Sequence, residues 1–180
     1  MPVVVRPADP ADHPAIAELT AGVYVGEGFS GADYEPALRD VAGRAGSASV
    51  LVAVDGERIV GAVTVATRGG EWAEQAASGE AVIRMLVVAA DQRGAGVGAA
   101  LVVRCLEQAR DDGCTVVRLS TQTDMRAAHR LYARLGFERT PAYDWQPVPG
   151  LTLLGYAIDL STEGGSAAVR PPGRGDAARP

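Results

Sequence analysis

Apolar and polar residues repeat along this chain with two different periods, which indicates a mixture of strands and helices. Six runs of apolar, often β-branched residues predict strands. They cover Val3–Arg6, Ser49–Val54, Arg58–Thr67, Ala81–Val88, Thr115–Thr121 and Leu151–Leu160. The two residues Asp55-Gly56 between the second and third runs favour a type I′ hairpin. The run after residue 80 is apolar on both faces apart from Arg84, which is typical of a central strand.

Helical periodicity fills most of the stretches between these runs. Asp9-Pro10-Ala11-Asp12 supplies cap residues for a helix that is expected to end near Gly22, and a second helix is predicted over Glu35–Arg44. A third begins at Val97, has apolar residues every three or four positions and reaches Arg110. A fourth covers Arg126–Leu135 and has Gly136 as its C-cap. The segment Asp144–Gly150 is expected to be an exposed loop.

These elements predict one α/β domain over residues 1–160. With 180 residues, of which 47% are hydrophobic and 22% charged, the chain is long enough for one substantial core. Residues 161–180 are Gly, Pro, Ser, Ala and Arg with almost nothing to bury, which predicts a disordered tail.

Composition excludes several kinds of chemistry. All 17 basic residues are arginines, so neither a Schiff-base lysine nor the lysine of a P-loop is present. Cys105 and Cys114 are too few for a disulfide framework and are expected to be buried or half-buried thiols. With only His13 and His129 as histidines, a metal site is not expected.

Charge and hydropathy bear on location and partners. The net charge of −5 argues against a nucleic-acid partner, because nucleic-acid-binding domains usually carry a basic face. No apolar run approaches the ~20 residues of a membrane helix, and the first residues lack a basic region followed by an apolar stretch and a cleavage site. We therefore expect a cytoplasmic protein with no membrane partner.

The run from Arg93 to Gly98 (Arg-Gly-Ala-Gly-Val-Gly) lies between a predicted strand and a predicted helix. Glycines let a ligand approach the backbone, and the unpaired N–H groups at the start of a helix then face that ligand. This arrangement predicts a cradle for an anion, most plausibly a pyrophosphate. The same residues also satisfy the dinucleotide fingerprint G-x-G-x-x-G/A, but five residues separate strand from glycines and no acidic residue follows about 20 positions later.

Arg93-x-x-Gly96-x-Gly98 resembles the acetyl-CoA signature of the GCN5-related N-acetyltransferases. A second match lies at family spacing, because Ala128-x-x-Leu131-Tyr132-x-x-x-Gly136-Phe137 is similar to that family's A-x-x-L-Y-x-x-x-G-F helix. The resemblance implies a mixed, mostly antiparallel sheet of six to seven strands, splayed between the fourth and fifth and flanked by about four helices.

The resemblance also implies acetyl-CoA as the acyl donor. The backbone of Leu86, Val87 and Val88 would meet the thioester and pantetheine. The pyrophosphate would be wrapped by the continuous run Arg93, Gly94, Ala95, Gly96, Val97, Gly98 and Ala99. Many family members place an asparagine that touches the cofactor where this chain has Met125, and a methionine there can pack against pantetheine.

Tyr132 is the candidate acid, because in the family this tyrosine points its hydroxyl at the sulfur of CoA. With a reference pKa near 10 against about 8.5 for a thiol, we expect a hydrogen bond to the developing thiolate rather than full proton transfer. A backbone N–H at Leu86 or Val87 is the expected oxyanion donor, at a bulge of the strand. The position of a family glutamate is Ser120, so the general base stays open among Glu80, Asp124, His129 and ordered water.

The function that follows is an N-acetyltransferase acting on a primary amine of a small molecule or a protein. Acidic residues in the segments that border the acceptor side of the family fold would suit a cationic amine; they are Glu27, Asp33, Glu35 and Asp144. The alternative is a non-catalytic acyl-CoA sensor or interaction module that kept the cradle. A homodimer is one assembly state that the sequence leaves open.

Overall fold

The protein is described by a computed structural model for residues 3–74 and 76–161. Its strands are β1 (Val4–Pro7), β2 (Ser49–Asp55), β3 (Arg58–Ala66), β4 (Glu80–Val88), β5 (Val116–Gln122), β6 (Glu138–Arg139), β7 (Trp145–Val148) and β8 (Leu151–Asp159). Its α-helices are α1 (His13–Gly26), α2 (Glu35–Arg39), α3 (Val41–Ser47), α4 (Val97–Asp111) and α5 (Arg126–Arg134). Apart from residue 161, the tail predicted to be disordered lies outside the described residues.

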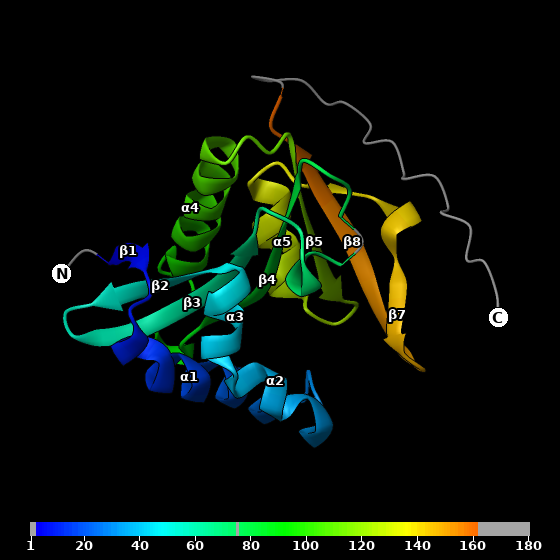
Figure 1. The fold of residues 1–180 in the computed structure, drawn as a ribbon. Coiled ribbons are helices and arrows are strands. Elements are labelled where there is room, and N and C mark those ends of the chain that lie inside the picture. The colour runs from blue at the N-terminus through cyan, green and yellow to red at the C-terminus, as the bar shows by residue number, and fades with distance from the viewer. Residues whose placement is uncertain (1–2, 75, 162–180) are drawn as a thin grey trace.

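All eight strands join one sheet in the order β1-β2-β3-β4-β5-β8-β6, and β7 also pairs with β8 (Figure 1). Every pair is antiparallel except β4 with β5. That parallel pair holds only from Glu80 opposite Val116 to Ile83 opposite Leu119. Beyond this point the rest of β4, from Arg84 to Val88, has no partner in β5. The splay between the fourth and fifth strands is thus confirmed.

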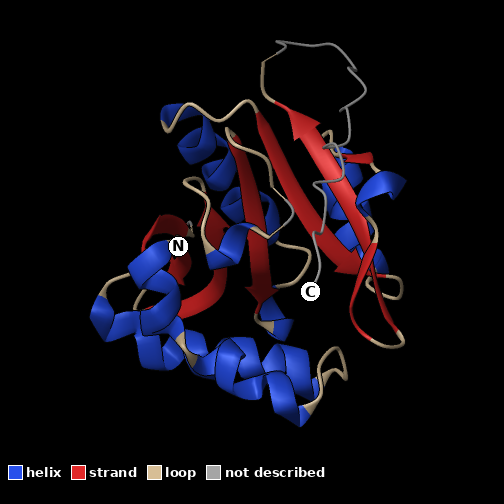
Figure 2. Cartoon of the chain, turned by 45° about the vertical axis from the view of Figure 1, so that its right-hand side comes forward, coloured by secondary structure: helices blue, strands red, loops and turns tan. Residues whose placement is uncertain are grey.

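Helices cover both faces of the sheet (Figure 2). One face packs on α4 and α5 through the largest apolar cluster, which includes Leu101, Leu119 and Phe137. The other face packs on α1 and α3 through a smaller cluster, which includes Ile16 and Val41. Hydrophobic burial on two faces of one sheet is the arrangement of a three-layer α/β domain. Cys105 and Cys114 are free, buried thiols, as predicted.

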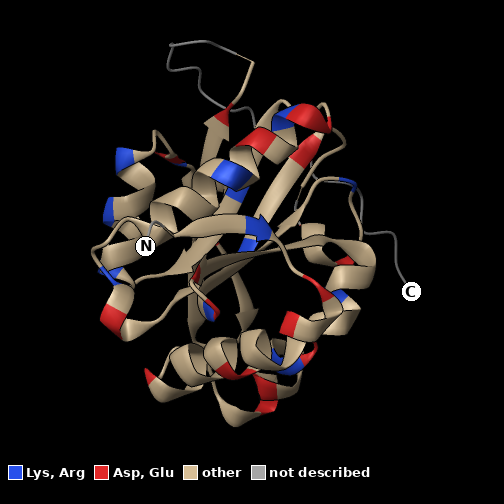
Figure 3. Ribbon diagram, turned by 90° about the vertical axis from the view of Figure 1, so that its left-hand side faces the viewer, with Lys and Arg blue, Asp and Glu red and all other residues tan. Residues whose placement is uncertain are grey.

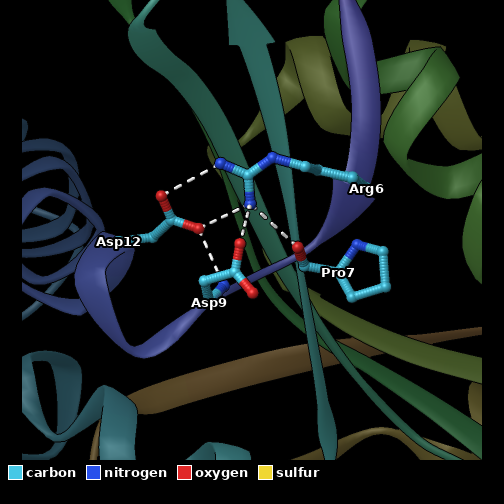
Figure 4. A network of polar contacts seen from close by, with 4 residues as sticks. All are labelled: Arg6, Pro7, Asp9 and Asp12. Atoms are coloured by element: carbon cyan, nitrogen blue, oxygen red, sulfur yellow. Dashed lines mark hydrogen bonds and ion pairs between the residues drawn. The ribbon is translucent and has the colours of Figure 1, made fainter.

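A charged network fixes the start of α1 against β1 (Figure 4). The Arg6 guanidinium donates to both carboxylate oxygens of Asp12 at 2.6 and 3.1 Å, and the backbone N–H of Asp9 donates to the same carboxylate at 2.8 Å. Arg6 holds the pKa of Asp12 below its ordinary value. Elsewhere, charged residues of both signs are interspersed along the ribbon (Figure 3).

The structure corrects several predicted boundaries. Helix α1 continues to Gly26 rather than ending near Gly22. The helix predicted over Glu35–Arg44 is two helices, because Asp40 leaves the helical conformation and its side chain accepts from the N–H of Gly43 at 2.8 Å as an N-cap. Part of the predicted loop 144–150 is strand β7, which pairs with β8.

The predicted hairpin between β2 and β3 is confirmed, but its turn lies one residue further along. Asp55 pairs with Arg58, so the turn residues are Gly56 and Glu57 rather than Asp55 and Gly56. Of the two, only Gly56 has a positive φ, of 62°. A glycine alone at the first turn position is the type II′ pattern rather than type I′.

Candidate active site

The opening between β4 and β5 begins at a bulge in β4. Met85 has φ 53°, the one positive φ at a non-glycine position in the described parts of the chain. Opposite it, the register with β3 shifts, since Thr64 pairs with Arg84 and Ala62 with Val87. Two residues of β4, Met85 and Leu86, therefore face one residue of β3, which is the definition of a bulge.

The bulge changes which side chains of β4 face helix α4. Before it, Ala81 and Ile83 belong to the cluster on the α4 side; after it, Leu86 and Val88 pack on that cluster and Val87 lies in the opposite one. The extra residue thus reverses the alternation of the strand and reorients the adjoining peptide groups. A strained residue at an open strand edge is typical of a functional site.

The glycine loop lies between the end of β4 and the start of α4. Gly94 and Gly96 have φ of 81° and 87°, and a Cβ built on either meets no atom within 4 Å. Gly96 is the N-cap of α4 and has no side chain to bond the first helical N–H groups. These donors and the open space above two glycines fit an anion bound against the backbone.

Gly98 contributes to packing rather than to the open space of the cradle. A Cβ at this position would lie 3.2 Å from Cδ2 of Leu131 in α5 and 3.6 Å from Cγ2 of Val88 in β4. The first contact is tighter than ordinary packing, so a larger residue at position 98 would require the Leu131 side chain to move. The two sequence motifs therefore meet directly in the fold.

We expect Gly96→Ala to destabilise the protein by about 1 kcal/mol, because an L-residue is disfavoured at φ 87°. Gly22→Ala is the matched control, since Gly22 lies inside α1 and has no atom within 4 Å of the added Cβ. The same chemical change should there stabilise the protein by up to about 1 kcal/mol. Urea unfolding of both variants checks the opposite signs.

Arginines and carboxylates surround the cradle in pairs. Arg93 forms a short ion pair with Glu27, the residue that follows α1. Arg58 donates to both oxygens of Asp91 at 2.6 and 2.9 Å, just before the glycine loop. The sequence predicted that Arg93 lies at the cradle, but it did not predict that the guanidinium of Arg93 is paired with the carboxylate of Glu27.

Tyr132 is buried on α5, with 6% of its surface exposed. Its ring lies 5.8 Å from that of Phe137 and 6.2 Å from that of Tyr156, measured between centroids. Burial raises the pKa of Tyr132 well above its ordinary value, and Tyr24 and Cys105 raise it further. The phenol is therefore a hydrogen-bond donor throughout the neutral and mildly alkaline range.

Tyr24 is a second phenol that sequence reasoning did not connect with Tyr132. It belongs to α1, yet it is near enough to Tyr132 of α5 to affect its pKa. Tyr24 packs against the cluster between the sheet and α1, which includes Val87 of β4. Burial raises the pKa of Tyr24 to about 12. Its position in the last turn of α1 gave no sequence signal.

The structure separates the candidate general bases. Glu80 accepts from Nε and Nη2 of Arg118, each at 2.6 Å, and lies at the closed end of the β4–β5 pair. Leu86 lies six residue steps further along the strand, about 20 Å away, so Glu80 is not placed to act at the bulge. His129 forms a hydrogen bond through Nε2 with the carbonyl of Gln122 at 2.9 Å and is partly buried, and Asp124 is exposed.

Met125 caps the start of α5 where β5 ends, and its sulfur lies 3.5 Å from the hydroxyl of Thr121. It therefore lies just beyond the end of β5. Its expected contact with pantetheine stays a prediction. Among the acidic residues of the acceptor side, Glu35 pairs with Arg39 and Asp144 with Arg139, as Glu27 does with Arg93. These pairs offset most of the negative charge that the sequence suggested for this side.

Helix α5 also carries an exposed row of arginines at every fourth position, namely Arg126, Arg130 and Arg134. None of the three makes an ion pair with another described residue. Like charges at this spacing repel one another, which an anionic ligand nearby would relieve. Leu131 of the same helix touches the cradle at Gly98.

No group of three or more His, Cys, Asp and Glu in residues 3–74 and 76–161 is arranged to hold a metal ion. Across the same residues, no helix is long and apolar enough to cross a membrane.

A split mixed sheet with a bulged central strand, a glycine cradle and a buried tyrosine beside it defines an acetyltransferase class of fold. The acetyltransferase (GNAT) family matches residues 14–137 of the sequence. The chain therefore belongs to the GNAT acetyltransferase family.

Individual similarities agree with this assignment. An acetyltransferase structure from Kribbella flavida is 27% identical, with a TM-score of 0.67 over 88% of this chain and 98% of that one. A Salmonella typhimurium protein, named as a candidate acetyltransferase and solved with its cofactor acetyl-CoA, is 22% identical, with a TM-score of 0.67 over 91% and 96%. N-acetyltransferase 8B of Rattus norvegicus is 37% identical over 94 residues, which are 51% of this chain. The matched segment spans only 40% of that rat protein, and a second match spans 30% of N-alpha-acetyltransferase MAK3 of Arabidopsis thaliana.

Proposed function

We propose that this protein transfers the acetyl group of acetyl-CoA to a primary amine. The observation that carries the proposal is that three features lie around the split of the sheet. They are the bulge at Met85, the open glycine cradle before α4 and the buried Tyr132. Family membership supplies the acetyltransferase class, and acetyl-CoA in a structural neighbour supports the choice of donor.

The cradle residues fit the phosphate end of this donor. Backbone N–H groups at the start of α4 and the open space above Gly94 and Gly96 suit a pyrophosphate, and the arginine row of α5 adds positive charge close by. The unpartnered part of β4, with Leu86 to Val88, offers a free strand edge for the amide groups of pantetheine. Met125 would border the same path.

Acetyl-CoA would supply an acetyl group on a thioester, in which the carbonyl carbon is bonded to sulfur. A reoriented N–H of the bulge, at Leu86 or Val87, would stabilise negative charge on the carbonyl oxygen when the amine nitrogen adds to the carbon. Tyr132 would donate a hydrogen bond to the sulfur when the carbon–sulfur bond breaks. The amine loses one proton to a base, for which ordered water is favoured over Glu80 because of the ion pair of Glu80 with Arg118.

The acceptor is an amine of a small molecule or a protein. A preference for a cationic amine would depend on the acidic residues of the acceptor side, of which Asp33 alone makes no ion pair with another described residue. We further propose a cytoplasmic location and leave a homodimer as an assembly state for measurement. N-alpha-acetyltransferase MAK3 of Arabidopsis thaliana, 40% identical over 57 residues, makes peptide amino termini worth including among the acceptors tried.

Release of free thiol from acetyl-CoA, measured over a panel of small amines and peptides, tests the proposal. We expect turnover with at least one acceptor, together with calorimetric binding of acetyl-CoA alone. Binding without turnover on any amine would favour the non-catalytic acyl-CoA sensor. Absence of both would contradict the assignment of the cradle.

A further inference from the structure

One short segment contacts both sides of the split. Residues Glu27 to Phe29, called here the bridging segment, follow α1 directly. On the β4 side, the carboxylate of Glu27 accepts from Arg93 of the glycine loop. On the β5 side, the carbonyl of Phe29 accepts from the side chain of Gln122, the last residue of that strand. The segment therefore spans the end of the sheet at which the two strands have separated.

The backbone of the bridging segment is folded back on α1. The N–H groups of Phe29 and Ser30 both donate to the carbonyl of Tyr24, at 2.8 and 3.0 Å, and Gly28 takes a φ of 76°. This turn places the side chain of Glu27 in contact with Arg93 beside the cradle. The pairing of Glu27 with Arg93 thus comes from a shaped turn rather than from a chance encounter of two long side chains.

A carboxylate and a phosphate bind a guanidinium through the same planar fork of N–H groups. Glu27 and a pyrophosphate in the cradle therefore compete for Arg93. Both side chains of the pair are partly open to solvent, with 45% of Arg93 and 35% of Glu27 exposed, so the exchange of one anion for the other needs no unfolding. Asp91, the other carboxylate of this region, is already held by Arg58.

We infer that Glu27 sets the affinity for acyl-CoA by competing with the pyrophosphate for Arg93. Donor binding displaces the carboxylate and leaves the bond from Gln122 to Phe29 as the remaining link between the bridging segment and the two sides of the split. Occupancy of the cradle thereby changes how firmly the end of α1 is held against the sheet. The inference rests on the proposed function, because it assumes that the cradle holds the pyrophosphate of CoA.

Calorimetric titration with CoA tests the inference. We expect Glu27→Gln to bind CoA about fivefold more tightly than the wild type at low salt. A factor of this size corresponds to the free energy of one solvent-exposed ion pair when little salt is present to screen it. Pantetheine, which has no pyrophosphate, should bind both proteins equally. In the Arg93→Gln background, addition of Glu27→Gln should change CoA affinity less than twofold, because the contested guanidinium is gone.

Glu107→Gln is the matched control. It removes the same charge and breaks an arginine pair, with Arg104 at 3.6 Å, on an exposed part of α4, and should leave CoA affinity unchanged. Hydrogen exchange gives a second readout: CoA should speed exchange at Phe29 and Ser30 in the wild type, and these amides should already exchange fast in Glu27→Gln.

The outcomes separate this inference from the proposed function. Equal CoA affinity of the wild type and Glu27→Gln would overturn the competition while leaving the cradle in place. If Glu27→Gln also raises CoA affinity in the Arg93→Gln background, Glu27 acts by general electrostatic repulsion of the phosphates. This result would overturn the competition for Arg93 as well. Failure of the wild type to bind CoA would overturn both. A loss of turnover in Glu27→Gln without a change in CoA affinity would assign the carboxylate to the acceptor instead.

Discussion

Replacing Tyr132 by phenylalanine should lower kcat about 100-fold while CoA affinity stays within a factor of two. The hydroxyl is the only atom removed, and a positioned donor to a leaving group is worth on the order of 10²-fold. The buried ring keeps its contacts with Phe137 and Tyr156, so the helix should not move. Steady-state kinetics with saturating acceptor, beside calorimetric binding of CoA, measures both quantities.

Tyr156→Phe is the matched control for this change. Tyr156 is a buried tyrosine whose ring centroid lies 6.2 Å from that of Tyr132, and losing its hydroxyl should change kcat less than twofold. A loss below about threefold in Tyr132→Phe would show that Tyr132 is only a core residue.

The pH dependence gives an independent check. Because burial raises the pKa of Tyr132, its phenol stays protonated, and kcat should not fall between about pH 8 and pH 10, where an unperturbed tyrosine would begin to ionise. An alkaline decline with an apparent pKa below 10 that disappears in Tyr132→Phe would contradict this assignment of the proton.

Glu80→Gln should lower the free energy of unfolding by about 3 kcal/mol at pH 7, roughly a 150-fold change in the ratio of folded to unfolded protein. Only 6% of the Arg118 side chain and 11% of the Glu80 side chain are exposed. Removing the carboxylate leaves a buried guanidinium without its counterion, and Nη1 of Arg118 already has no hydrogen-bond partner among the described residues. Chemical denaturation of the wild type and variant measures the difference.

Two comparisons show whether the cost comes from the buried charge. The double variant Glu80→Gln with Arg118→Met should recover much of the lost stability, since it removes the stranded cation. Glu107→Gln, which breaks the solvent-exposed pair with Arg104, should cost less than about 1 kcal/mol. If Glu80→Gln proves no worse than Glu107→Gln, the ion pair does not stabilise the sheet in the way we describe.

The cost should also depend on pH. Burial alone would raise the pKa of Glu80, but Arg118 and the N–H of Ala77 outweigh it and hold the pKa below 4.5. A carboxylate with a depressed pKa stabilises the fold fully above its unfolded pKa, and this contribution is lost as the pH falls through the folded pKa. The difference between wild type and variant should therefore shrink below about pH 4.

The sequence was sufficient to predict an α/β fold, because this depends on local patterns with a strong physical cause. The splay of the sheet was predicted from the family resemblance that the two motifs carry. Glycines at positive φ, a helix cap and period-two apolar runs act over a few residues. The turn of the β2–β3 hairpin was misplaced by one residue because Asp-Gly and Gly-Glu both fit a tight turn, and only the register of the paired strands decides between them.

Other features depended on tertiary contacts. Strand β7 contains Pro147 and is largely exposed, so its sequence is that of a loop, and pairing with β8 makes it a strand. Asp40 is the N-cap that separates α2 from α3, and an aspartate at this position could have been recognised as a helix start from the sequence. A bulge in β4 was expected from the family resemblance alone, and the pairing with β3 places it at Met85 and Leu86. The pair of Glu27 with Arg93 joins residues far apart in sequence and leaves no local mark. The assigned cofactor contacts, from Leu86 to Val88, from Arg93 to Ala99 and at Met125, stay predictions.

The contact of Gly98 with Leu131 has a consequence for how this chain can vary. A methyl group at residue 98 would require Cδ2 of Leu131 to move by a small amount, whereas a bulkier side chain would press on α5, which carries the adjacent Tyr132. The glycine loop and the tyrosine helix, though more than 30 residues apart, are therefore expected to vary together at positions 98 and 131 among related sequences in which residue 98 is bulky. A bulky residue at 98 without a smaller residue at 131 would be expected to displace Tyr132 from its contacts with Phe137 and Tyr156.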